Sequence, residues 1–387
     1  MGKKRVAYVV NHVAFFVSHR LSVATGARMN GFEVLLLTGQ AGSLEMEQTA
    51  VAQLKAAGFK HQRMFFSSSG VNPLVELLGL VQLVWFMLRY RPDVVHCASP
   101  KGVLYGGIAA RLCRVPGLVL AISGMGYAYT TGKGRGGARA LVRSIYGALV
   151  GFAFNHQNVR VIVQNQDDYQ SVVEKGLAPS HRVTLIPGSG VDLSLFSGSR
   201  PDNKLRMVLL PARMLKDKGV EEFVAAARLI KAQAPGWRFV MAGAAGYDNP
   251  TAIDIAQLKA WQAEGSIEWL GHVDAMTPLF RDAAIVCLPS YREGMPKALL
   301  EAAAAGCAVV TTEVTGCREA IEPSVTGDLV PVRDSEALAK ALLSLINDES
   351  RRQAFGVKGQ ARAKAMFSVS SVVSQTVQIY NGLLGNE

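Results

Sequence analysis

The chain has 387 residues, of which 49% are hydrophobic and 18% charged, and its formal net charge is +11. This length suits two domains of about 150–200 residues rather than one, and the composition excludes a disordered or low-complexity chain. The five cysteines are scattered, without a Cys-x-x-Cys pair or a Cys/His cluster. A disulfide framework and a structural zinc site are therefore not expected, and we expect a reduced, cytosolic chain.

The first half alternates short apolar strands with helices. A basic start precedes an apolar run, as in a signal peptide, but His12, His19 and Arg20 interrupt that run and no cleavage site follows, so a first core strand is expected instead. Strands are predicted at residues 5–11, 31–39, 92–99 and 118–123, and helices at 21–30, 73–90 and 101–114. The apolar stretch 77–88 is shorter than the roughly 20 residues that span a bilayer, which predicts a buried or interfacial helix.

The same alternation restarts after a turn-rich linker at residues 182–204. Further strands are predicted at 207–212, 237–244, 267–272, 284–290 and 308–313. This pattern predicts an α/β protein with parallel sheets covered on both faces. We expect two domains, residues 1–190 and 191–365, that face a cleft, and a C-terminal helix at 366–387 that packs back toward the first domain. Ligands of such sheets bind at the carboxyl ends of the strands.

The positive charge lies in the first half. Residues 1–200 contain 21 Lys and Arg against 9 Asp and Glu, whereas residues 201–387 contain 20 against 21. No carboxylate occurs between Asp93 and Asp167. A one-sided field of this kind attracts nucleic acid, anionic lipid or a diphosphate substrate. Without aromatic–basic interleaving or a nucleic-acid-binding motif, we expect no nucleic-acid partner.

A glycine-rich basic loop and the helix after it, residues 130–154, suit an anionic membrane surface. Arg139 and Arg143 are four residues apart there and would share one helix face. A solvated helix over an ordinary core is the alternative interpretation. Gly-x-Gly-x-Gly-Gly at 132–137 follows no strand and is surrounded by cations, so we reject it as a dinucleotide fingerprint.

The sharpest motif is SYREGMPKALLEAAAAG, residues 290–306. A predicted strand leads into the Glu-Gly-Met-Pro loop at 293–296, and Pro296 fits the first turn of the helix that Gly306 ends. The loop amides would then point from a helix N-terminus into the cleft and could bind an anion or a hydroxyl. Glu293 and Glu301 alone would be read as surface charges, but this strand–loop–helix context favours a site.

A second motif, PARMLKDKG at residues 211–219, follows the first strand of the second domain. Arg213 and Lys218 are five residues apart in a loop that enters a helix. Two cations at a strand end suit a diphosphate, because Arg makes bidentate contacts and Lys acts as a point charge. On its own, such a loop would be read as a solvated basic turn.

Together these two motifs resemble the nucleotide-sugar site of retaining family-4 glycosyltransferases with the GT-B fold, which has two Rossmann-like doubly wound domains. PGSGVDLSLF in the linker and WLGHVDAMTPLFRDAAIVCLPS are similar to segments of that family. In the first half, FVSHRL, PKGVLYGGIAARL, AISGMGYAYT and VIVQNQDDY resemble a subgroup that adds N-acetylhexosamines to undecaprenyl-diphosphate-linked, bacillosamine-type acceptors. Many family members have a donor-contacting His where this chain has Ser123 and Gly124, so no His receives that role.

The resemblance implies a donor site for a UDP-sugar formed by Arg213, Lys218, Glu293, Gly294, Met295 and Glu301. Arg213 and Lys218 would hold the diphosphate, and Glu301 would bind the ribose hydroxyls. Glu293 and the amides of Gly294 and Met295 would hold the sugar, so that Glu293, Arg213 and Lys218 form the catalytic group. Candidates for the acceptor side are Ser18, His19 and Arg20 in the turn after the first strand, and Lys101 and Gly102 after another strand.

Other polar residues are read as structural. His96 lies inside an apolar strand and is expected to be a satisfied core histidine, and Asn165 and Asp168 are expected to cap a helix. The sequence contains no Asp-x-Asp. We therefore expect no metal and no cofactor, with cations and helix dipoles offsetting the charge on the leaving diphosphate.

The expected function is retaining transfer of a sugar from UDP to a polyprenyl-diphosphate-linked saccharide. The enzyme would work from the cytoplasm as a peripheral protein on the inner face of the cytoplasmic membrane. Three alternatives stay open: a transferase with a soluble acceptor, a nucleotide-sugar epimerase, and a non-catalytic protein that binds anionic membranes. The last explains the charge but neither motif of the second domain.

Overall fold

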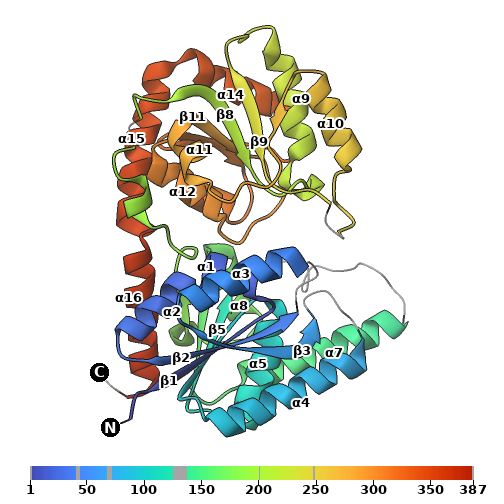
Figure 1. Ribbon diagram of the computed structural model, residues 1–387, viewed down its shortest axis with the longest axis vertical. Coiled ribbons are helices and arrows are strands. Elements are labelled where there is room, and N and C mark those ends of the chain that lie inside the picture. The colour runs from blue at the N-terminus through green and yellow to red at the C-terminus, as the bar shows by residue number, and fades with distance from the viewer. Residues whose placement is uncertain are drawn as a thin grey trace. The chain divides into compact units, whose positions relative to one another are not determined.

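The computed structural model describes residues 2–40, 44–67, 72–124, 137–199, 201–246 and 249–385, without the side chains of 44–46 and 137–145. The chain divides into two compact units (Figure 1). Unit 1 is Met1–Ser189 with Ser370–Glu387, and unit 2 is Gly190–Val369. The C-terminal helix therefore belongs to unit 1, and the divisions lie within a few residues of those expected at 190 and 365.

The described part of unit 1 contains a seven-stranded parallel sheet in the order β3-β2-β1-β4-β5-β6-β7. The strands are β1 Arg5–Val10, β2 Glu33–Gln40, β3 Lys60–Ser67, β4 Val94–Ala98, β5 Gly117–Ile122, β6 Val159–Val163 and β7 Val183–Leu185. The helices are α1 Val13–His19, α2 Leu21–Met29, α3 Leu44–Ala56, α4 Pro73–Tyr90, α5 Pro100–Leu112, α7 Gly137–Phe154, α8 Gln166–Glu174 and α16 Val369–Leu383, with the 3-10 turn η1 Ser180–Arg182.

The described part of unit 2 contains a six-stranded parallel sheet in the order β10-β9-β8-β11-β12-β13. The strands are β8 Leu205–Pro211, β9 Arg238–Ala242, β10 Glu268–Trp269, β11 Ala283–Leu288, β12 Ala308–Thr312 and β13 Gly327–Val330. The helices are α9 Val220–Lys231, α10 Ile255–Ala263, α11 Thr277–Asp282, α12 Lys297–Ala305, α13 Cys317–Ala320, α14 Ser335–Asn347 and α15 Glu349–Met366, with 3-10 turns η2 Leu193–Phe196 and η3 Lys216–Lys218.

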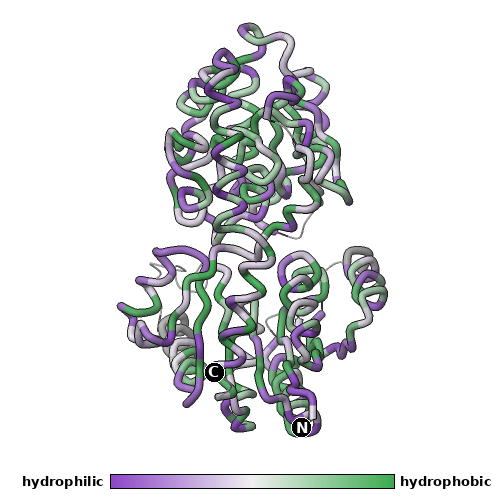
Figure 2. The backbone as a smooth tube through the Cα atoms, turned by 90° about the vertical axis from the view of Figure 1, so that its left-hand side faces the viewer, coloured by the Kyte–Doolittle hydropathy of each residue, from purple (hydrophilic) through white to green (hydrophobic). Residues whose placement is uncertain are grey.

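The central strands are apolar along their whole length because helices cover both faces of each sheet. In β4, β5, β11 and β12 every residue is buried, and the hydropathy colouring of Figure 2 shows hydrophobic segments running through both units. The sequence analysis did not assign β3, β6, β7 or β13 as strands. The edge strands β3 and β13 keep polar or half-exposed residues, since only one of their sides pairs with a neighbour.

Each sheet reverses its strand order once. In unit 1 the reversal lies between β1 and β4, and in unit 2 it lies between β8 and β11. The loops that leave two such strands diverge to opposite faces of the sheet and leave a crevice at the carboxyl ends, where ligands of open α/β sheets bind. These two points are therefore where functional polar side chains are expected.

Among the described helices, α4 is long and apolar enough to cross a membrane by length and composition, and only 17% of it is buried.

Candidate active site

The reversal point of unit 2 is marked by an ion pair between two predicted site residues. Lys218 ends η3, which follows β8, and Glu293 lies in the loop after β11. The Lys218 ammonium donates to Glu293 Oε1, and the two side chains are only 19% and 14% exposed. The parallel neighbours β8 and β11 thus bring together residues that lie 75 positions apart.

Glycines let the loops around this pair pack backbone against backbone. Gly316, in the loop after β12, has φ +79°, and a Cβ there would lie 2.4 Å from the carbonyl oxygen of Gly294. Gly219, with φ +69°, would place a Cβ 2.2 Å from the carbonyl oxygen of Pro289. Any side chain at either position would displace the loop that carries Glu293.

The N-terminus of α12 opens at the same point. Pro296 is the N-cap residue and not part of the first turn, which moves the predicted start of the helix by one residue. No side chain caps this end and its first turn contains no acidic residue, so the partial positive charge of the helix is left for another group. Gly306 ends the helix in the left-handed conformation, as predicted.

Glu301 and Arg213 belong to the same unit as the ion pair, on α12 and on the loop after β8. Glu301, on α12, is 3.4 Å from the ammonium of Lys297, and burial raises the pKa of its carboxyl group even though Lys297 opposes this. Arg213 is exposed on the loop between β8 and η3. The predicted donor residues thus all lie in unit 2, and an ion pair joins Lys218 to Glu293.

The sequence analysis missed a group that fixes the loop before Glu293. The hydroxyl of Tyr291 donates to Glu222 Oε1 at 2.7 Å, and its backbone amide donates to the carbonyl oxygen of Asp217 at 2.9 Å. The guanidinium of Arg333 lies 4.6 Å from the centre of the Tyr291 ring. Burial, reinforced by Glu222, raises the pKa of Tyr291 to about 12. No spacing rule pointed to these partners, because they come from separate loops.

Cys317 adds a neutral group beside the ion pair. It begins α13 and is fully buried. Burial, followed by the charge of Glu293, raises the pKa of its thiol to about 12. The thiol therefore stays protonated near neutral pH and brings no second negative charge to the site.

The reversal point of unit 1 is filled by the chain itself. Asn11 Oδ1 accepts hydrogen bonds from the hydroxyl of Ser99 at 2.7 Å and from the amides of Lys101 and Gly102 at 3.1 and 3.2 Å. The Lys101 ammonium is 2.9 Å from Glu76 Oε1. Lys101 and Gly102 thus lie at the expected end of the sheet, but these groups bind within the unit.

The prediction that Ser18, His19 and Arg20 form a turn holds only for Arg20, which stands between α1 and α2, and is corrected for the other two. Ser18 and His19 end α1, and the ring of His19 stacks on Phe15 with 4.8 Å between ring centres. Arg20 is buried, only 4% exposed. Burial lowers the pKa of its guanidinium, although the nearby hydroxyls of Tyr8 and Tyr380 oppose this.

Arg20 belongs to a buried polar cluster that also contains His96. The hydroxyls of Tyr8 and Tyr380 are 2.8 Å apart, and His96 Nδ1 is 2.7 Å from the Tyr380 hydroxyl. His96 Nε2 has no hydrogen-bond partner among the described residues, so the expectation of a satisfied core histidine holds for only one of its nitrogens. The other structural prediction is confirmed, since Asn165 caps α8 by accepting from the amide of Asp168 at 2.8 Å.

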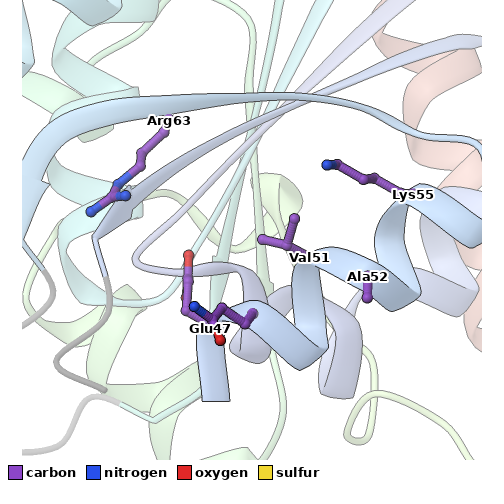
Figure 3. Close-up of a pocket in the computed structure, with 6 residues that line it drawn as sticks. Glu47, Val51, Ala52, Lys55 and Arg63 are labelled. Atoms are coloured by element: carbon purple, nitrogen blue, oxygen red, sulfur yellow. The ribbon is translucent and has the colours of Figure 1, made fainter. Parts of the chain in front are cut away.

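An open hollow of about 450 Å³ is lined by residues of α3 and β3. In Figure 3 Glu47, Val51 and Ala52 line it from α3, and Arg63 lies across from Glu47. Burial raises the pKa of the Glu47 carboxyl group, and the charge of Arg63 opposes this. No motif in the sequence indicated this place.

Two of the sequence predictions fall on parts of the chain that the structure leaves out. Residues 125–136, which hold Met-Gly-Tyr of the AISGMGYAYT segment and most of the glycine-rich basic loop, lie outside the described residues, as do the side chains of Arg139 and Arg143. Within the described ranges, no three His, Cys, Asp or Glu residues are grouped as a metal site would require.

Models of known protein families match both halves of the chain. The model for glycosyl transferases group 1 matches residues 206–348, which hold the ion pair and α12. The model for the glycosyl transferase 4-like domain matches residues 18–188. The two models together span most of the chain, which therefore consists of a glycosyl transferase 4-like domain followed by a glycosyl transferases group 1 domain. It is therefore a glycosyltransferase enzyme, and the predicted class is confirmed.

Two curated relatives of this glycosyltransferase act on undecaprenol-linked compounds by name. The N,N'-diacetylbacillosaminyl-diphospho-undecaprenol alpha-1,3-N-acetylgalactosaminyltransferase of Campylobacter jejuni is 26% identical over 86% of this chain and 89% of that protein. The UDP-Gal:alpha-D-GlcNAc-diphosphoundecaprenol alpha-1,3-galactosyltransferase of Escherichia coli is 24% identical over 72% of this chain and 73% of that protein.

Solved structures confirm the GT-B fold with two Rossmann-like domains. Anabaena HepE in complex with UDP and glucose has a TM-score of 0.76 and 17% identity, over 96% of this chain and 98% of that one. At this identity the likeness concerns the fold alone.

Proposed function

We propose that this glycosyltransferase moves an N-acetylhexosamine from a UDP-sugar to a saccharide linked to polyprenyl diphosphate, with retention at the anomeric carbon. The observation that carries the proposal is the Lys218–Glu293 pair beside the uncapped N-terminus of α12. The activities named for the Campylobacter and Escherichia relatives support the lipid-linked acceptor. The enzyme would act in the cytoplasm, on the inner face of the cytoplasmic membrane, in the assembly of surface polysaccharides.

Donor binding would exchange the partner of Lys218. A diphosphate carries more charge than one carboxylate, so it would draw the Lys218 ammonium away from Glu293, with Arg213 and the α12 N-terminus adding positive charge. The Glu293 carboxylate would then be able to accept hydrogen bonds from the hydroxyls of the sugar. Glu293 would therefore become available to the sugar only when the donor diphosphate has bound Lys218.

Transfer with retention would follow a front-face route. The acceptor hydroxyl attacks the anomeric carbon from the side of the leaving UDP, and the leaving phosphate oxygen takes the hydroxyl proton as the glycosidic bond to UDP breaks. Lys218, Arg213 and the helix dipole offset the charge that grows on UDP, and we propose that no metal is required.

UDP release tests this function. Purified enzyme is incubated with a panel of UDP-sugars, with and without a short-chain polyprenyl-diphosphate saccharide, in EDTA or in Mg²⁺. We expect release that depends on acceptor, occurs with one UDP-N-acetylhexosamine, and is equal in both buffers. Release with a soluble sugar acceptor alone, or epimerised UDP-sugar without any acceptor, would replace the proposal with one of those activities. A folded protein that binds no UDP-sugar would overturn it altogether.

A further inference from the structure

Helix α4 carries a continuous apolar stripe on its outer side. Its exposed residues are Leu74, Leu77, Leu78, Val81, Trp85 and Leu88, each more than half exposed. Helical residues advance by about 100° each, so these side chains share an arc of about 100°. Gly79, Leu83 and Met87 are buried on the opposite side. The helix is therefore apolar on both faces, and only the inner one packs on other parts of the chain that the structure describes.

The inner face ties α4 to the rest of unit 1, where it packs on β3 and α5 (Figure 1). The Glu76 carboxylate pairs with Lys101 of α5 at 2.9 Å. Gln82 Oε1 accepts from the backbone amide of Phe65, on edge strand β3, at 2.9 Å. A Cβ on Gly79 would lie 2.7 Å from the amide nitrogen of Phe66. Crossing a bilayer would break these contacts, so the structure suits a helix that lies in the plane of a surface.

Arginines outnumber carboxylates at the C-terminal end of the stripe, where Asp93 accepts from the backbone amide of Arg5. The single carboxylate of α4, Glu76, is on the inner face with its side chain 11% exposed. Exposed Arg89 and Arg91 stand at the C-terminal end of the helix. The nearby end of α5, joined to α4 by the contact of Cys113 Sγ with the carbonyl oxygen of Val84, exposes Leu112 and Arg114. Leucine, valine and tryptophan beside arginine are typical of helices that lie in the headgroup region of anionic bilayers.

We propose that the outer face of α4 inserts into the headgroup–acyl boundary of an anionic lipid bilayer and docks unit 1 on the membrane. An anionic bilayer matches the apolar stripe, its cationic end and the surplus of Lys and Arg in residues 1–200. It also rests on the proposed function, because an acceptor with a polyprenyl chain is held in the bilayer. Docking through α4 keeps the basic unit at the depth where the acceptor diphosphate lies.

Vesicle flotation with a matched pair of variants tests the docking face. Val81 on α4 and Val357 on α15 of unit 2 are both 58% exposed. With phosphatidylglycerol–phosphatidylcholine vesicles we expect Val81→Glu to lower the partition coefficient about tenfold or more, because a carboxylate disfavours insertion, and Val357→Glu to leave it unchanged. Wild-type binding should fall on pure phosphatidylcholine. Equal binding by Val81→Glu and wild type would overturn the proposal.

Trp85→Phe is a conservative variant that controls for a folding defect in Val81→Glu. The other tryptophans, Trp237, Trp261 and Trp269, are all in unit 2. If α4 inserts, vesicles of brominated phosphatidylglycerol quench the fluorescence of the wild type through Trp85, and Trp85→Phe loses most of this quenching while still binding. Quenching that persists unchanged in Trp85→Phe would show that α4 does not enter the lipid.

Two further measurements distinguish membrane docking from self-association and from a defect in transfer itself. Analytical ultracentrifugation that shows a wild-type dimer and a Val81→Glu monomer would assign the face to a second copy and overturn the proposal. Transfer to a short, water-soluble acceptor should be unchanged in Val81→Glu, whereas transfer to an acceptor in vesicles should fall with binding. If no acceptor supports transfer but binding still depends on Val81 and the lipid still quenches Trp85, the docking surface stands and the proposed function fails.

Discussion

The two sheet reversal points have the same topology, but different side chains lie at the helix N-terminus in each. In unit 1, Asn11 fills the crevice and binds the N-terminus of α5. In unit 2 the equivalent helix end, at α12, has no side-chain cap, and an ion pair stands beside it. The Asn11 side chain already supplies the acceptor that an anion would otherwise provide.

This difference shows that a doubly wound sheet creates a place for a ligand without deciding whether it is used. A single amide side chain satisfies the unit 1 helix end, which then contributes to the stability of that unit. In unit 2 the loops keep two opposite charges together beside a helix end that no side chain caps. Substitutions at the two reversal points test this division, starting with the largest expected effect.

Removing either charge of the unit 2 pair should abolish most of the activity. For Glu293→Gln and for Lys218→Ala we expect kcat/KM for the donor to fall about 100- to 1,000-fold, because each group stabilises charge or orientation in the transition state. UDP release under initial-rate conditions measures this, with Glu336→Gln, an exposed change on α14, as the control. Near-wild-type rates in both variants would mean that the catalytic site is elsewhere.

Adding one methyl group at Gly316 should displace the loop that carries Glu293. Gly316 and Gly198 share a φ of +79°, but a Cβ on Gly198 meets nothing within 4 Å. We expect Gly316→Ala to lower kcat/KM about tenfold or more, whereas Gly198→Ala costs only the backbone strain of about 1 kcal/mol and keeps its activity. Initial rates and thermal melts of both variants make the comparison. Equal activity in the two would show that the loop contact does not position Glu293.

In unit 1, Asn11→Ala should act on stability rather than on catalysis. Asn11 Oδ1 accepts three hydrogen bonds, so its loss should lower the free energy of unfolding by about 2 kcal/mol. Asn72→Ala, which removes one exposed cap bond on α4, should cost less than about 1 kcal/mol. Denaturant melts measure both. A raised acceptor KM with unchanged stability would instead make the unit 1 crevice a binding site.

The smallest effect expected is a pH dependence of donor binding. Burial raises the pKa of Glu301, so its carboxylate is protonated at a higher pH than an exposed glutamate and then accepts ribose hydrogen bonds less well. We expect the donor KM to rise about threefold as the pH falls through that raised pKa, and Glu301→Gln to remove this dependence. A pH profile of KM tests it, and an identical profile in the variant would exclude Glu301 as its source.

Local sequence patterns determined the alternation of strands and helices, the division into two parallel sheets, and the motif that starts α12. These depend on neighbours within one element, such as an apolar run of five residues or a proline before a run of alanines. The edge strands β3 and β13 were missed because their partly polar residues lack such a run.

The sequence by itself also determined that charged residues follow β8 and β11. The apolar run of each strand shows where the strand ends and its loop begins. Only the tertiary structure decided that Lys218 pairs with Glu293, that Arg20 is buried, that Asn11 closes the unit 1 crevice and that the apolar side chains on one face of α4 are exposed. Each of these depends on contacts between elements far apart in the chain. Parallel pairing and packing set those contacts, and no local spacing records them.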